Sequence, residues 1–90
     1  MTVAPQHLTI CNERGLHARA AAKFVKTAEQ FEAELVVSKG DNQVSGRSIM
    51  GLMMLAAAKG CQIEIRAEGT EAEAAMAAIR ELVENAFGEE

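Results

Sequence analysis

A histidine and an arginine stand close together at the start of a helical pattern of apolar residues. His17 and Arg19 follow Gly15, and the apolar positions after them recur at helical spacing: Ala21, Phe24, Val25 and Ala28. The N-terminus of a helix presents unpaired N–H groups and the positive end of the helix dipole, which together attract an anion. The same field disfavours a protonated imidazole, so we expect His17 to be neutral more often than a free histidine.

A neutral imidazole close to an arginine is a combination suited to phosphoryl chemistry. A neutral ring nitrogen is a nucleophile, and the planar guanidinium of Arg19 matches the oxygens of a phosphate. The pair therefore predicts a place where a phosphoryl group is held on His17. The alternative is a solvated histidine near a helix start and an arginine that only covers the surface, and spacing alone leaves both interpretations open.

The elements that must position this pair follow from the periodicity of the rest of the chain. Alternating apolar residues predict four strands, at His7–Cys11, Phe31–Ser38, Gln43–Gly46 and Cys61–Ala67. Helical periodicity predicts three helices, at about Ala18–Gln30, Ile49–Leu55 and Glu71–Phe87. Strands with one apolar face need cover on one side only. We therefore expect an α+β open-faced sandwich, a four-stranded antiparallel sheet with three helices on one face.

Length and composition restrict the function classes. The chain has 90 residues, enough for a single domain over residues 1–90, and its net charge of −4 argues against general nucleic-acid binding. No apolar run is long enough to span a membrane and no signal peptide is evident, so the sequence predicts a cytoplasmic protein without a membrane partner. The segment Met1–Gln6 has little pattern, and Pro5 suits an entry loop.

The second apolar helix is unusual because its apolar residues face nearly all directions. Ser48 is a good N-cap residue, and Leu52 and Leu55 are expected in the core. The residues expected on an exposed, partner-binding face are Ile49, Met50 and Met53. The alternative is that these methionines fill a core that is short of aromatic side chains.

Cysteine and histidine positions give no sign of a metal or redox centre. Cys11 and Cys61 form no Cys-x-x-Cys motif, and His7 and His17 have no ligand spacing with them. We expect two thiols, a surface His7, and no metal or cofactor.

Two separated motifs resemble those of the histidine-containing phosphocarrier (HPr) family. Gly15-Leu-His-Ala-Arg19 resembles the family's active-site segment, and Ser48-Ile-Met-Gly-Leu-Met resembles its second signature. The order of the expected elements also agrees along essentially the whole chain. The resemblance implies an HPr-like sandwich and a carrier that is not itself an enzyme. Enzyme I phosphorylates such a carrier on histidine, and the carrier passes the group to an enzyme II A component.

The resemblance assigns roles to individual residues. It implies that His17 accepts the phosphoryl group on Nδ1 and that Arg19 contacts that group. Ser48 matches a serine that HPr kinase/phosphorylase phosphorylates in some relatives, although it can also be only a helix cap. Ala20 departs from the family pattern, which has proline here, and so adds an N–H donor to the first turn. A monomer is expected, because a carrier must expose one site to several partners.

The branch of the family and the rival functions remain open. The stretch Leu52–Gly60 and the acidic end Phe87–Glu90 look like the nitrogen-related carriers (NPr), whereas the Ser48 motif leans toward serine-regulated carriers. We favour a regulatory, nitrogen-related chain, with sugar transport as the alternative. The rivals are a ligand-binding domain without phosphoryl transfer and a signalling protein phosphorylated only on Ser48.

Overall fold

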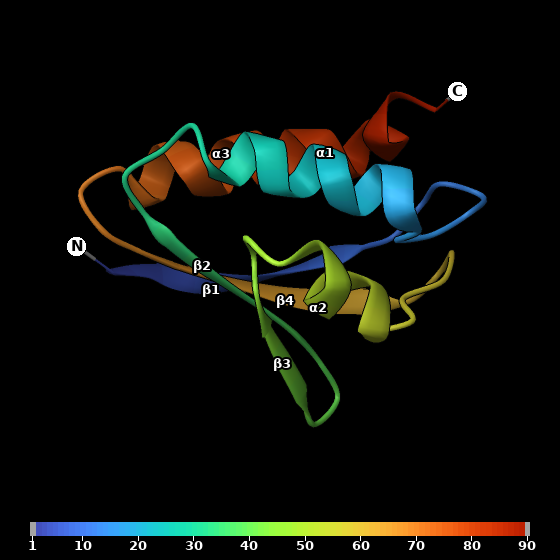
Figure 1. The fold of residues 1–90 in the computed structure, drawn as a ribbon. Coiled ribbons are helices and arrows are strands. Elements are labelled where there is room, and N and C mark those ends of the chain that lie inside the picture. The colour runs from blue at the N-terminus through green and yellow to red at the C-terminus, as the bar shows by residue number, and fades with distance from the viewer. Residues whose placement is uncertain (1, 90) are drawn as a thin grey trace.

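Four antiparallel strands form one sheet, in the order β1-β4-β2-β3. The structure is a computed structural model that describes residues 2–89, so Met1 and Glu90, at the ends of the expected domain, lie outside the described residues. The strands are β1 Thr2–Thr9, β2 Glu34–Lys39, β3 Asn42–Ser45 and β4 Gln62–Glu68. The helices are α1 Ala18–Ala28, α2 Ile49–Met54 and α3 Ala72–Glu84, followed by a short 3₁₀ turn at Ala86–Gly88. Figure 1 shows α1 and α3 side by side above the sheet and α2 beside β3.

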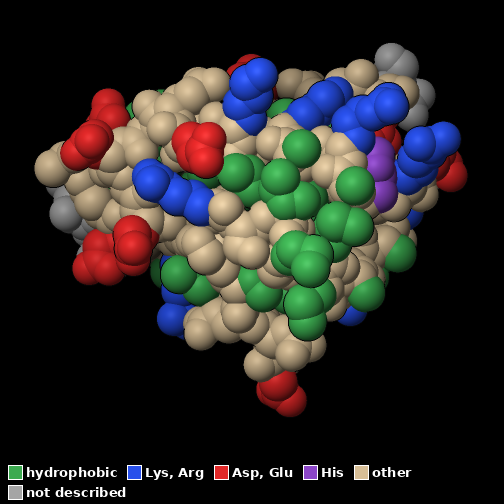
Figure 2. All heavy atoms as spheres, in the orientation of Figure 1, with side chains coloured by type: hydrophobic (Ala, Val, Ile, Leu, Met, Phe, Trp, Pro, Cys, Tyr) green, Lys and Arg blue, Asp and Glu red, His purple; other side chains and the backbone are tan. Residues whose placement is uncertain are grey.

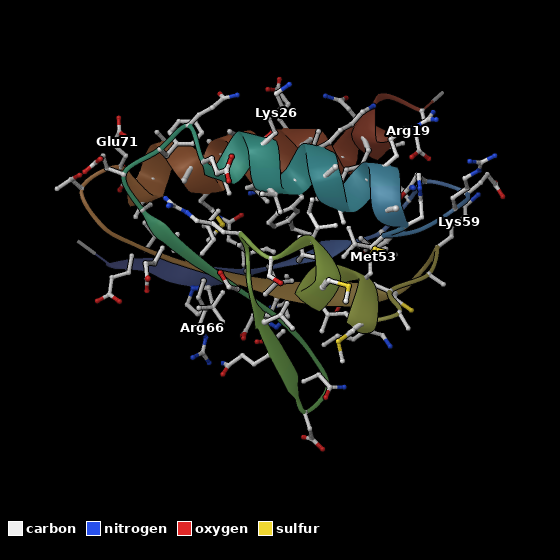
Figure 3. The ribbon with its side chains drawn as sticks, in the orientation of Figure 1. Arg19, Lys26, Met53, Lys59, Arg66 and Glu71 are labelled. Atoms are coloured by element: carbon white, nitrogen blue, oxygen red, sulfur yellow. The ribbon has the colours of Figure 1, made fainter. Side chains whose placement is uncertain are left out.

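The two faces of the sheet differ because side chains alternate along a strand. The buried strand residues point toward the helices: Leu8, Leu35, Val37, Ile63, Ile65 and Ala67. The opposite face is polar, and there His7 lies 3.6 Å from Glu64 of the neighbouring strand. Arg66 also projects on this side, away from α1 and α3 (Figure 3). The predicted α+β sandwich, a four-stranded antiparallel sheet covered by three helices, is confirmed.

The helices supply the other half of the core. The buried residues of α1 include all those predicted from its periodicity and also Ala20. The buried residues of α3 are Ala72, Ala75, Met76, Ile79 and Val83, while Leu82 is half-buried against them. Within residues 2–89, no helix has both the length and the apolar character needed to cross a bilayer.

The N-terminal segment corrects one expectation. We predicted an entry loop up to Gln6, but β1 begins at Thr2 and pairs with β4 through Val3 opposite Ala67. The register shifts between Val3 and Gln6, so Pro5 lies at an irregular point of an edge strand. Proline is tolerated there because an edge strand leaves one side of its backbone without a ladder partner. Alternation that is interrupted by such a shift gives no strand signal.

The end of the third helix also differs from the sequence-based prediction. We predicted a helix to Phe87, but α3 ends at Glu84, and Ala86 and Phe87 both adopt left-handed backbone angles, with φ of 55°. The turn places the fully buried Phe87 ring in the core. Burial of an aromatic ring stabilises a fold by about 2–3 kcal/mol. Each left-handed residue costs about 1–3 kcal/mol, so burial of the ring offsets the strain of the two residues only in part. Further contacts also hold this turn, among them a hydrogen bond from Lys23 to the carbonyl oxygen of Phe87.

Candidate functional site

The loop before α1 is built to present one side chain. Gly15 has a φ of +67°, and a Cβ atom there would lie 2.5 Å from the carbonyl oxygen of Ala57, so only glycine fits this position. The next residue, Leu16, donates its N–H to the same oxygen at 2.9 Å. Asn12, fully buried, donates its side-chain amide to the Gly15 carbonyl at 2.7 Å. The backbone that carries His17 is therefore fixed from both sides.

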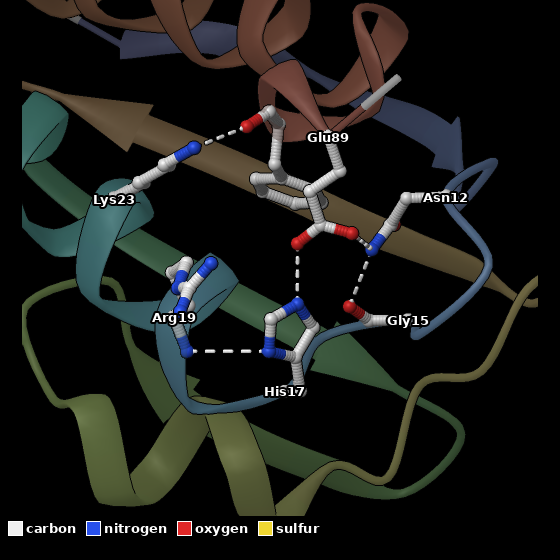
Figure 4. Close-up of polar contacts among 7 residues, drawn as sticks. Asn12, Gly15, His17, Arg19, Lys23 and Glu89 are labelled. Carbon is white, nitrogen blue, oxygen red and sulfur yellow. Dashed lines mark hydrogen bonds and ion pairs between the residues drawn. The ribbon is translucent and has the colours of Figure 1, made fainter.

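His17 is the N-cap residue of α1, with extended backbone angles of −82° and −178°. Its Nδ1 accepts a hydrogen bond of 3.3 Å from the backbone N–H of Arg19. Its Nε2 faces the carboxylate of Glu89 from the end of the chain (Figure 4). The imidazole retains 23% exposure, so a partner can reach it. One ring nitrogen thus lies at the start of a helix and the other lies against an acid.

The surroundings of the imidazole carry excess positive charge. Arg14, Arg19 and Lys23 line a hollow that His17 shares. Of the two carboxylates there, that of Glu13 forms a 2.6 Å ion pair with Lys59. This hydrogen bond from Lys59 lowers the pKa of Glu13 below its usual range. Together with the first-turn N–H groups of α1, these cations form an environment suited to a phosphoryl group.

The second predicted site residue, Ser48, lies at the start of α2. It is the N-cap residue, and its Oγ accepts a 2.9 Å hydrogen bond from the backbone N–H of Gly51. The predicted capping role of Ser48 is confirmed. Leu52 and Leu55 are buried, also as predicted.

A patch of exposed apolar side chains covers the outside of α2. This methionine patch consists of Ile49, Met50, Met53 and Met54, with Met54 the most exposed at 77%. The first three were predicted from the sequence to be exposed. Met54 was not predicted, although its spacing of one helical turn from Met50 is a usable signal. Figure 2 shows a histidine between lysine and arginine side chains on one side and a group of hydrophobic side chains on the other. A shallow hollow beside His17 is lined by Arg14, Leu16 and Ala56–Ala58, the last of which follow α2 in the chain.

Comparison with known proteins identifies the family. The family model for the PTS HPr component phosphorylation site matches residues 5–85. The chain belongs to the HPr family. The phosphocarrier protein HPr of Neisseria meningitidis serogroup B is 52% identical over 84 residues, 93% of this chain and 94% of the relative. The phosphocarrier protein NPr of Shewanella violacea is 42% identical over 89 residues, 99% of this chain and 98% of the relative.

Solved HPr structures share the fold. HPr-C-His from Thermoanaerobacter tengcongensis superposes with a TM-score of 0.92 at 41% identity, over 98% of this chain and 99% of that one. A structure described as an HPr dimer from the same organism superposes with a TM-score of 0.77 at 43% identity, over 91% of this chain and 94% of that one. HPr proteins are phosphocarriers of the phosphotransferase system and not catalytic enzymes, and enzyme I and enzyme II components are the partners that this family implies.

The structure brings His17 and Arg19 together at one helix start, whereas Ser48 belongs to a different helix. Three residues near His17 were not found from the sequence: Asn12, Lys23 and Glu89. Lys23 follows Arg19 by one helical turn, which is a signal of a shared face. Glu89 has no such signal, because it reaches the site only through the turn after α3. Among residues 2–89, no group of three or more metal-binding side chains is placed to hold an ion.

Proposed function

We propose that His17 accepts a phosphoryl group on Nδ1 from phosphorylated enzyme I and passes it to an enzyme II A component. The observation that carries this proposal is the position of Nδ1, which accepts the Arg19 N–H at the start of α1 and therefore has its lone pair there. In the transfer, this lone pair attacks phosphorus, the bond from phosphorus to the donor breaks, and the donor recovers its electron pair. The reverse sequence delivers the group to the acceptor.

The protein's own groups stabilise the transferred phosphoryl oxygens. The N–H of Arg19 needs only to exchange its weak 3.3 Å bond to Nδ1 for a phosphoryl oxygen. Ala20 stands in the same first turn and offers an N–H that the proline of the common family pattern lacks. The guanidinium of Arg19, exposed at the rim of the hollow, supplies the positive charge. No metal or cofactor is required for these steps.

The methionine patch is the surface proposed to dock enzyme I and the acceptor in turn. Ile49, Met50 and Met53, with Met54 beside them, expose flexible apolar side chains on α2, and α2 contacts α1, the helix that His17 caps. Methionine adapts to differently shaped partners, which suits a carrier with more than one. A carrier must expose one site to several partners, so we also propose that the protein is a monomer. We propose further that it acts in the cytoplasm, as one domain over residues 1–90. Light scattering of the purified chain checks the oligomeric state.

Ser48 is proposed as a second, regulatory site that HPr kinase/phosphorylase modifies. Its side chain lies at the start of α2 and beside the methionine patch. A phosphate there adds about two negative charges next to the apolar docking surface and so opposes partner binding. Incubation with the kinase and ATP, followed by mass analysis of Ser48→Ala against wild type, tests this site.

For the branch, we propose a regulatory, nitrogen-related chain. The resemblance of Leu52–Gly60 and of the acidic C-terminal residues to NPr supports it, as does the 42% identity to an NPr over 99% of the chain. The alternative is a general, sugar-transport HPr, which the 52% identity to HPr of Neisseria favours. Competition between a nitrogen-related and a sugar-specific enzyme II A for the phosphorylated carrier distinguishes the two.

The central experiment is acid-labile phosphorylation by enzyme I and phosphoenolpyruvate. We expect label on the wild type and on Ser48→Ala, and none on His17→Ala. Ser48→Ala is the matched control, because it also removes the N-cap side chain of a helix. Absence of label from the wild type, with the donor enzyme shown to be active on another carrier, would contradict the proposal. Label that persists on His17→Ala would place the phosphoryl group elsewhere.

A further inference from the structure

The chain after α3 turns back onto the phosphoryl site. The turn with left-handed Ala86 and Phe87 redirects the backbone, and the buried Phe87 ring anchors it in the core. Lys23 of α1 donates its ammonium to the Phe87 carbonyl oxygen at 2.7 Å. Glu89 is thereby held against His17, far away in the sequence (Figure 4). The strain of two left-handed residues persists because these contacts determine the path of the chain.

The carboxylate of Glu89 has two fixed partners. Its Oε2 contacts Nε2 of His17, and its Oε1 accepts a 3.0 Å hydrogen bond from the side-chain amide of Asn12. The same amide group of Asn12 donates to the Gly15 carbonyl oxygen at 2.7 Å. Two acceptors around one nitrogen establish that the NH₂ end of Asn12 points here. The hydrogen bonds from His17 and then from Asn12 lower the pKa of Glu89, so this acid is ionised at neutral pH.

The neighbours of the two ring nitrogens require one tautomer. An ionised carboxylate only accepts hydrogen bonds, so Nε2 must carry the proton that it donates to Glu89. The N–H of Arg19 only donates, so Nδ1 must carry a lone pair. Both contacts favour the same form of the neutral imidazole, the one with its lone pair at the start of α1.

We propose that Glu89 is a positioning residue for phosphoryl transfer, which holds the Nε2–H tautomer of His17 and thereby keeps Nδ1 available to the phosphoryl group. The inference rests on the proposed function. When Nδ1 forms its bond to phosphorus and the donor's bond breaks, Nε2 keeps its proton and the ring becomes positively charged. The carboxylate of Glu89 lies against that charge and stabilises it. No proton has to leave the site during the step.

The test compares Glu89→Gln with Glu84→Gln. Glutamine is nearly the size of glutamate but is uncharged, and its amide can donate to Nε2 as well as accept from it, so the tautomer preference is lost. Glu84→Gln makes the same charge change near the end of α3, at an exposed carboxylate that pairs with Arg80. Nitrogen-15 spectra of histidine-labelled protein report the tautomer of each ring, with the exposed His7 as internal reference.

In the wild type and in Glu84→Gln, we expect His17 to show the Nε2–H tautomer and to be phosphorylated at equal rates. In Glu89→Gln, we expect a population of the Nδ1–H tautomer and an initial phosphorylation rate that is lower by about tenfold, as for other residues that orient a functional histidine. An unchanged tautomer in Glu89→Gln overturns the proposal, even if the rate falls. An unchanged rate with a changed tautomer also overturns it.

The two measurements separate this inference from the proposed function. The tautomer is read on unphosphorylated protein, so it tests the contact of Glu89 with His17 whether or not enzyme I is the donor. If the wild type shows the Nε2–H tautomer but takes no label from active enzyme I, the proposed function fails and the positioning role in transfer fails with it. If the wild type takes label but shows the Nδ1–H tautomer, only the inference about Glu89 fails.

Discussion

The starts of α1 and α2 make the most informative comparison in this molecule. Each helix has a side-chain N-cap: His17 accepts the N–H of Arg19 through Nδ1 at 3.3 Å, and Ser48 accepts the N–H of Gly51 through Oγ at 2.9 Å. The shorter bond belongs to the serine, which is the better cap. The longer bond belongs to the histidine, which is surrounded by cations and faces a carboxylate.

The two helix starts differ in their neighbours and not in the helix itself, so in our proposal the neighbours make one of them reactive. The dipole and the unpaired N–H groups are common to both starts. At α1, a tight turn at Gly15, a buried asparagine and the residues that return after α3 orient one imidazole. At α2, the neighbours are exposed apolar side chains that suit docking. In our proposal, one start therefore holds the phosphoryl group and the other belongs to the surface that partners recognise.

Removal of the arginine at α1 should give the largest effect. In Arg19→Ala, the phosphoryl oxygens lose a cation, and we expect the rate of phosphorylation by enzyme I to fall about 100-fold, or about 2.7 kcal/mol in the barrier. Arg66→Ala, which removes an arginine from the opposite face of the sheet, should leave the rate unchanged. Equal effects of the two substitutions in a rapid-quench assay would mean that only the overall charge matters.

The turn before α1 should give the next largest effect. Gly15→Ala combines a left-handed φ of +67° with a 2.5 Å approach to the Ala57 oxygen, so we expect a loss of about 2–3 kcal/mol in the free energy of unfolding. Gly40→Ala has a similar φ of +60° but no atom within 4 Å, so it should cost only about 1 kcal/mol. Urea denaturation measures both. Equal losses would show that the close approach to residue 57 is relieved without cost.

The cap of α2 should give a smaller effect, and one confined to stability. Ser48→Ala leaves the Gly51 N–H without its side-chain acceptor, so we expect a loss of about 1 kcal/mol in the free energy of unfolding. The phosphorylation rate of His17 at saturating enzyme I should not change. A large fall in that rate would mean that the two helix starts act as one site and do not have separate roles.

The smallest effect should appear as a pH dependence at α1 only. The hydrogen bonds from His17 and Asn12 lower the pKa of Glu89 from its ordinary value of 4.5, so the ionised acid stabilises the fold above pH 4.5. This contribution is lost as the pH falls through the lowered pKa. The stability difference between wild type and Glu89→Gln should therefore shrink in acid, whereas that of Ser48→Ala should stay constant. Thermal unfolding at several acidic pH values gives both curves.

Local patterns in the sequence predicted most of the fold. Alternation around Leu35 and Ile63 and helical spacing around Phe24 gave the type and order of the elements, because one-sided burial leaves a period that can be read directly. The Ser48 cap was also predictable, since a cap acts over three residues. The irregular β1 was not, because a register shift at Pro5 interrupts the period on which the prediction depends.

The candidate site was predictable only where its residues lie close together in the sequence. His17 and Arg19 lie in one short segment, so their spacing carries the signal. Glu89 reaches the imidazole only because non-glycine residues at 86 and 87 adopt left-handed angles. No propensity predicts that conformation for alanine and phenylalanine, and only the tertiary contacts of Phe87 and Lys23 explain it.

The strand order has a consequence for the way the chain folds. β4 lies between β1 and β2, so Leu8 finds its partner Ile63 only after α1, β2, β3 and α2 have been synthesised. The β2–β3 hairpin and α1 can form early because their contacts are local, but closure of the long β1–β4 loop must follow, and such topologies fold on the order of milliseconds or slower. During synthesis, Glu89 emerges 72 residues after His17 and after every helix and strand of this domain. The contact of Glu89 with His17 is therefore among the last within this domain to form.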